Sequence, residues 1–146
     1  MSMEENIRVL EEATKAFAER DWERFNELHD ESVVVHSPVN PEPLKGLAAH
    51  REQARSLMKA FPDLTFERER VFGHGDWVCE VNTLKATHKG PLTGPTGEDI
   101  PPTNKPVQFQ TCNVIKVVEG KIMEEHSYYD ALGIMAQLGL VPESDE

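Results

Sequence analysis

Apolar residues recur at three- and four-residue spacing in several stretches of the chain, which predicts amphipathic helices. In the first stretch Ile7, Leu10, Ala13 and Phe17 form an apolar stripe with charged residues between them. Asp21 is a favourable N-cap for a second short helix, and Pro62 disfavours continuation of a third. The predicted helices cover residues 4–19, 22–29, 47–60 and 131–138.

β-Branched and aromatic residues dominate the remaining apolar segments, which predicts strands. The predicted strands cover residues 32–36, 64–72, 77–88, 107–118 and 121–129. Glu119-Gly120 is a hairpin signal, and residues 73–76 form a turn. Residues 90–106 are rich in Gly, Pro and Thr, and such a long loop is typical of a lid or a pocket rim.

Helices cluster early and consecutive strands cluster late, so the order of elements favours an α+β fold with a mostly antiparallel sheet. A long sheet with a helix on its concave side leaves a hole between them, which is the natural place for a ligand. The length of 146 residues fits one domain, covering residues 1–146, with an acidic tail from about residue 141.

The net charge of -11 argues against nucleic acids and anionic membranes as partners. Nucleic-acid binding needs a basic footprint, and an acidic chain is repelled by anionic membranes. No apolar run is long enough for a membrane span, and residues 1–6 lack the apolar segment of a signal peptide, so we expect a cytoplasmic protein. Cys79 and Cys112 lie in predicted strands and are predicted to be buried thiols rather than a disulfide.

Candidate chemistry concentrates in residues 121–130, the last predicted strand and the start of the final helix. Side chains alternate along a strand, so Glu124, His126, Tyr128 and Asp130 share one face. The other face carries the residues Met123, Glu125, Ser127 and Tyr129. Four titratable groups in line face either bulk water or a polar pocket, and the functional interpretation is the pocket.

Short motifs in a fixed order carry a resemblance across nearly the whole chain. They are Arg20-Asp21-Trp22, His36-Ser37-Pro38, Phe61-Pro62-Asp63, Gly75-Asp76-Trp77-Val78, Thr87-His88-Lys89-Gly90, Glu119-Gly120-Lys121-Ile122, Tyr128-Tyr129-Asp130 and Gln137-Leu138-Gly139. Together they resemble the SnoaL-like polyketide cyclase (ester cyclase-like) family, within the nuclear transport factor 2-like superfold. The resemblance implies a cone-shaped α+β barrel with a curved sheet wrapped around helices, a central pocket and a homodimer formed through the sheet.

The same resemblance implies that Asp130 is the general base of an intramolecular aldol ring closure, without a metal or an organic cofactor. Burial in an apolar pocket would raise the pKa of such a carboxyl group and strengthen it as a base. The structural alternative is an N-cap, because Asp130 directly precedes the last helix, and the two roles are compatible. His126 is a candidate proton donor to an enolate, although family members often carry tryptophan there.

Further residues are candidates for the substrate pocket, although the sequence leaves open which strand faces are concave. They are His36, His88, Tyr128, Asn82, Trp22, Asn113 and Phe61. The histidines show no metal-binding spacing, so no metal site is predicted. His29, His50 and His74 are predicted to be surface residues.

The leading hypothesis is therefore a cofactor-free enzyme of the cyclase type, acting on a small apolar ligand with ketone or ester groups. A non-catalytic small-molecule binding module is the alternative from a different class. An isomerase or a dehydratase using the same carboxylate is a third, because one fold hosts many chemistries.

Overall fold

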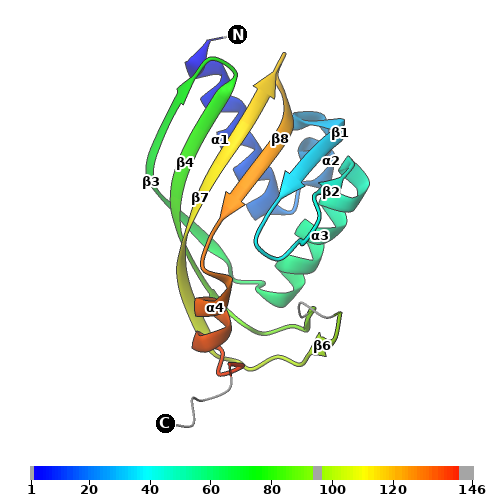
Figure 1. Cartoon of the computed structure of the whole chain (residues 1–146), viewed down its shortest axis with the longest axis vertical. Helices are drawn as coiled ribbons and strands as arrows, with labels where there is room; N and C mark the ends of the chain where they lie inside the picture. Colours follow the sequence, from blue (N-terminus) through cyan, green and yellow to red (C-terminus); the bar gives the residue numbers. More distant parts are fainter. Residues whose placement is uncertain (1, 94–96, 142–146) are drawn as a thin grey trace.

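A curved sheet covered on its inner side by helices forms the body of the protein (Figure 1). The computed structural model describes residues 2–93 and 97–141. The helices are α1 (Met3–Glu19), α2 (Trp22–Leu28), α3 (Leu47–Ala60) and α4 (Ala131–Gln137). The strands are β1 (His29–His36), β2 (Leu44–Lys45), β3 (Thr65–His74), β4 (Trp77–Thr87), β5 (Leu92–Thr93), β6 (Asp99–Ile100), β7 (Pro106–Val118) and β8 (Lys121–Tyr128).

The main sheet has the strand order β2-β1-β8-β7-β4-β3. Its neighbours pair antiparallel except β1 and β8, which run parallel, so the mostly antiparallel α+β fold is confirmed. The sheet stays open, with β2 and β3 at its edges, and is not closed into a barrel. The β5–β6 pair lies within the predicted long loop.

Side-chain caps set the start of three helices. Ser2 accepts from the Glu5 N–H at 3.2 Å, Asp21 from the Arg24 N–H at 3.1 Å, and Asp130 from the Gly133 N–H at 2.8 Å. Each cap satisfies a donor that the first helical turn leaves unpaired. Local sequence therefore fixes these boundaries, and the predicted helices agree with them to within one residue at each end.

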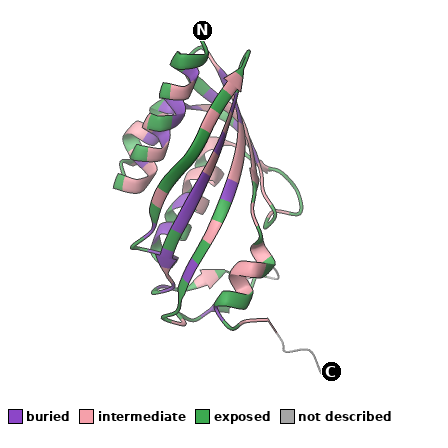
Figure 2. Ribbon diagram, turned by 90° about the vertical axis from the view of Figure 1, so that its left-hand side faces the viewer, coloured by how far each residue is buried: buried purple, intermediate pink, exposed green. Residues whose placement is uncertain are grey.

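The core fills the space between the inner face of the sheet and the helices. One cluster joins α1 to the sheet through Val9, Leu10, Val78, Ile115 and Ile122. A second cluster lies toward the opposite end and contains Met58, Phe61, Leu84, Val107 and Leu138. Figure 2 shows buried residues on the middle strands and on the sides of the helices that face the sheet. Val78, Ile115 and Ile122 thus mark the inner face of their strands.

Two predictions change in the structure. β1 begins at His29, inside the predicted helix 22–29, because His29 already has an extended backbone (φ -117°, ψ 146°) and caps α2. Cys79 and Cys112 are free thiols as predicted, but each is only half-buried.

Within the described residues, no helix combines the length and the apolar character needed to cross a bilayer. The predicted tail beyond residue 141 lies outside the described residues.

Candidate active site

The inner side of β8 is set by a bulge. Lys116 of β7 lies opposite Glu124, but the next residue, Val117, lies opposite Ile122. β8 therefore has one extra residue against β7 at this point, which reverses the alternation of its side chains. Beyond the bulge Glu125 lies opposite Ile115, so the Glu125 side chain points inward.

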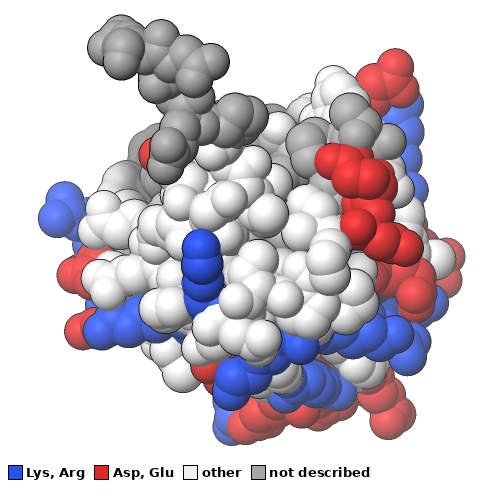
Figure 3. Space-filling view, turned by 90° about the horizontal axis from the view of Figure 1, so that it is seen from below, with Lys and Arg blue, Asp and Glu red and all other residues white. Residues whose placement is uncertain are grey.

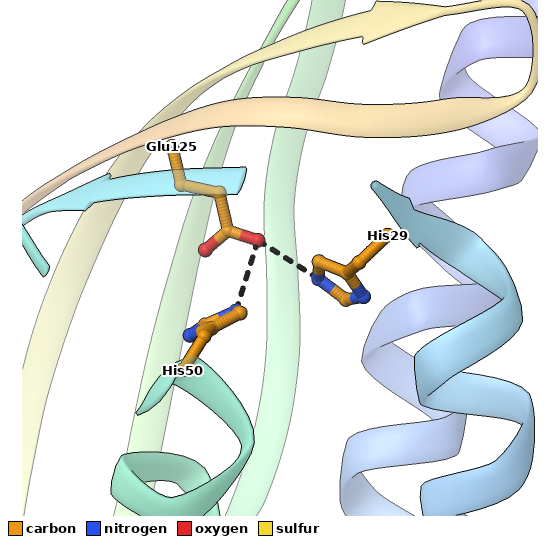
Figure 4. Close-up of side chains that lie close together, drawn as sticks. All are labelled: His29, His50 and Glu125. Atoms are coloured by element: carbon orange, nitrogen blue, oxygen red, sulfur yellow. Dashed lines mark hydrogen bonds and ion pairs between the residues drawn. The ribbon is translucent and has the colours of Figure 1, made fainter. Parts of the chain in front are cut away.

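Two histidines from different elements meet the Glu125 carboxylate there (Figure 4). The His29 Nε2 atom, at the start of β1, lies 3.1 Å from Glu125 Oε1, and the His50 Nε2 atom, on α3, lies 3.3 Å from the same oxygen. The His29 Nδ1–H donates to the Phe25 carbonyl oxygen at 2.7 Å, which fixes the orientation of this ring. Side-chain exposures of 1%, 12% and 14% for His29, His50 and Glu125 place the cluster largely inside the protein.

Electrostatics favour a charged pair in this cluster. Burial by itself would raise the pKa of Glu125, but the charge of His50 and the contacts with both histidines outweigh burial and lower it. Burial by itself would lower the pKa of His50, but the negative charge and the hydrogen bond of Glu125 outweigh burial and raise it. Each partner thus stabilises the charged form of the other.

One ring nitrogen of His50 has no hydrogen-bond partner among the described residues. This nitrogen is the buried Nδ1 atom. A buried polar atom without a partner costs about 1–3 kcal/mol, so such atoms are rare and often functional. This atom therefore lies beside a carboxylate that holds the other ring nitrogen, without a partner of its own among the described residues.

Further polar residues line the inner face of the sheet. Glu80 is 3% exposed and accepts from Asn113 Nδ2 at 3.0 Å and from Arg68 at 3.4 Å. Asn82 is also 3% exposed on the same face of β4. Burial raises the pKa of Tyr129, and a hydrogen bond with Ser37 offsets part of the increase. The interior therefore carries a polar stripe between the two apolar clusters.

The predicted pocket residues divide between the two sides of the sheet. On the inner side, in the polar stripe or in the apolar clusters, lie Asn82, Asn113, Phe61, Trp22 and His88. On the outer side lie His36, His126 and Tyr128, of which Tyr128 is 58% exposed. The bulge explains why His126 and Tyr128 lie outside the predicted pocket, since it turns the predicted polar face of β8 outward.

Asp130 is an exposed N-cap of α4, and it does not lie in an apolar interior as expected of a buried base. A Cβ atom at Gly133 would collide with the Asp130 carboxyl group, which shows how closely the cap fits. Asp130 also borders an open hollow of about 520 Å³, lined by Thr83, Gln108, Phe109, Gln110, Gly133 and Gln137. The neighbouring end of the molecule is largely uncharged at its centre, with charged side chains at its rim (Figure 3).

His88 is fully buried and holds the segment that follows the β5–β6 pair. Its Nδ1 atom accepts from the Thr103 N–H at 3.2 Å and lies 3.1 Å from the Thr103 hydroxyl. Burial lowers the pKa of His88, and a hydrogen bond with the Gly90 backbone opposes part of the decrease. A neutral ring with Nδ1 as acceptor fits this position, and its buried Nε2 atom, like His50 Nδ1, has no side-chain or backbone partner within hydrogen-bonding geometry among the described residues.

Among the residues that the structure describes, two sets of side chains each bring three possible metal-ligand atoms within 4.8 Å of one another. One is the inner cluster of His29, His50 and Glu125, and the other is His36, Glu124 and His126 on the outer face. Residue spacing along the sequence could not reveal either set, because each combines residues from elements far apart in the chain.

The sequence interpretation missed His29, His50 and Glu125. A signal for His50 was present, because it lies three residues after Leu47 and four before Ala54, on the buried stripe of α3. His29 had a weaker signal in Phe25, four residues earlier and buried. Glu125 had none, since its direction depends on the bulge.

Comparison with known proteins agrees with this architecture. The family model of the SnoaL-like polyketide cyclase matches residues 7–138. Nogalonic acid methyl ester cyclase from Streptomyces nogalater is 30% identical over 73 residues, so the match spans 50% of this chain and 51% of that protein.

Solved structures extend the likeness to the whole fold. A SnoaL-like protein from Jannaschia sp. CCS1 has a TM-score of 0.85 and 20% identity, covering 96% of this chain and 95% of that one. An NTF2-like protein from Burkholderia xenovorans LB400 has a TM-score of 0.74 and 16% identity, covering 94% and 98%. These structures share the fold, and the family match over residues 7–138 places the chain in the SnoaL-like polyketide cyclase family.

Proposed function

We propose that the protein is a cyclase-type enzyme that closes a ring by acid–base chemistry, with His50 as the general base. Family membership supports the cyclase-type function. The substrate class in this proposal is a small apolar molecule with ketone or ester groups, and the reaction needs no cofactor.

The single observation that carries the proposal is the free Nδ1 atom of His50 beside Glu125. In the neutral form of the ring the His50 Nε2–H faces Glu125 Oε1, 3.3 Å away, and the Nδ1 lone pair is free. A carboxylate in this position fixes the tautomer and stabilises the imidazolium that forms when the ring takes a proton. The raised pKa of His50 makes the ring a stronger base.

In the proposed reaction His50 carries out both proton transfers, first as a base and then as an acid. His50 Nδ1 removes the proton from the carbon next to a carbonyl group, and the electron pair of the C–H bond becomes an enolate. The enolate carbon attacks a second carbonyl carbon of the same molecule and forms the C–C bond. The resulting alkoxide takes the proton back from His50 Nδ1, so the product is an isomer of the substrate and no co-reactant is consumed.

Asp130 is the rival base, and a matched pair of variants separates the two. The assay follows exchange of the acidic carbon-bound proton of a β-keto ester into D2O by NMR, and ring closure with nogalonic acid methyl ester as the probe. We expect His50→Gln to lower the exchange rate by about 100- to 10,000-fold, and Asp130→Asn to keep it within about threefold. Full rate in His50→Gln would refute the assignment, and loss in Asp130→Asn alone would assign the base to Asp130.

Binding of the probe is measured on the same variants. A non-catalytic binding module would bind the probe in calorimetry but show no exchange above the solution rate in the wild type. That result would refute the proposed enzymatic function and support the non-catalytic binding module.

A further inference from the structure

A second cluster of ionisable side chains lies on the outer face of the sheet, away from His50. His36 ends β1, and its partner on the parallel strand β8 is His126. Glu124 lies two residues before His126 and therefore on the same face. Together these three residues form the outer triad.

The outer triad is compact. The His36 and His126 rings are stacked, with centroids 4.2 Å apart and planes 6° apart. His126 Nε2 lies 2.7 Å from Glu124 Oε1. Trp77, whose ring centroid lies 6.2 Å from that of His126, borders the group. All three residues are partly exposed, so the cluster is accessible from solution.

Hydrogen bonding does not account for this arrangement. His126 pairs with Glu124, but the His36 ring makes no hydrogen bond within the described part of the chain. Two imidazoles held side by side would repel each other if both were charged. A shared cation would satisfy both rings and the carboxylate at once.

We propose that the outer triad binds a divalent transition metal such as Zn²⁺. Imidazole nitrogen suits such ions better than Mg²⁺ or Ca²⁺, which prefer oxygen. The ligand atoms lie within 4.8 Å of one another. Binding would turn the two stacked rings so that a nitrogen of each points at an ion about 2.0–2.2 Å away. Three protein ligands leave one tetrahedral position for water.

The metal would join the parallel pair of strands in an otherwise antiparallel sheet. Two of its ligands flank Glu125 in sequence, so the metal would also hold the β8 segment that carries the inner carboxylate. The site is independent of the proposed reaction, since its ligands lie on the opposite face from His50. The acidic net charge of -11 favours a cation, although Lys116 lies opposite Glu124 and opposes it.

Calorimetric titration of tag-free, chelator-treated protein with Zn²⁺ tests the proposal. We expect one Zn²⁺ per chain, and at least a tenfold loss of affinity in both His36→Ala and His126→Ala. His74→Ala removes an exposed histidine of β3 and is the matched control, with unchanged affinity expected. Lys116→Ala should bind more tightly.

Titration of His50→Gln distinguishes the outer triad from the inner cluster. Unchanged affinity in His50→Gln supports the outer triad, whereas loss in that variant assigns the ion to the inner cluster and overturns the proposal. No binding by the wild type, or equal binding by His36→Ala, also overturns it. Circular dichroism of each variant shows that a loss of affinity is not a loss of folding.

Discussion

Ile122 and Glu125 both point to the inner side of the sheet, although an odd number of positions separates them. In a regular strand two such residues would face opposite sides. The extra residue of β8 between them removes the conflict, and it carries a carboxylate into the interior, where His29 and His50 meet it.

Replacing Glu125 by Gln tests the link between the carboxylate and the base. The amide keeps the shape of the side chain but removes the charge that raises the pKa of His50. We therefore expect a lower turnover rate, and an acid limb of the pH–rate profile that lies at lower pH than in the wild type. An unchanged acid limb would show that Glu125 does not control the titration of the base.

Stability should depend on pH through His50. Its pKa is raised in the folded state above the ordinary value of 6.5, so its contribution is fully present below that value and is lost as pH rises through the folded pKa. Urea unfolding between about pH 6 and pH 9 should show a steeper decline in the wild type than in His50→Gln. Parallel curves for the two proteins would contradict the raised pKa.

Asp130→Ala should destabilise the protein by about 1 kcal/mol, because the Gly133 N–H loses its acceptor. Asp130→Ser restores a capping oxygen and should recover most of the loss. The free energy of unfolding in urea measures both variants. A loss of activity without a loss of stability in Asp130→Ala would instead favour a catalytic role for Asp130.

His88→Leu should free the segment that contains Thr103. The Thr103 N–H then has no acceptor, which costs about 1–3 kcal/mol. We expect faster hydrogen exchange at the amides of Thr103, Asn104 and Lys105, measured by NMR. Thr103→Val keeps the N–H contact and removes only the hydroxyl, so it should have the smaller effect.

Cys79 should react slowly with thiol reagents at neutral pH. Burial, together with the hydrogen bond and charge of Cys112 and the charge of Glu80, raises its pKa to about 11. Because the thiolate is the reactive form, modification by a disulfide reagent should be much slower in the folded protein than in denaturant. Equal rates in the two conditions would argue against the raised pKa.

The helices and the long strands could be predicted because local signals specify them, whereas the two-residue strands β2, β5 and β6 were not predicted. Asp21 and Asp130 cap helices where the sequence places them, and α3 matches its predicted bounds of residues 47–60. The order of elements also favoured the α+β fold that the structure confirms. The parallel pairing of β1 with β8 had no such signal, since it joins segments far apart in the chain.

The sequence by itself thus determined the helices, the long strands, the order of these elements and the polar character of residues 121–130. Only the tertiary structure decided which of these residues face inward, because one extra residue in β8 reverses the alternation on which any prediction from sequence depends. It also decided that His29 and His50 meet Glu125, since helix α3 and strands β1 and β8 come together only when the sheet and helices pack.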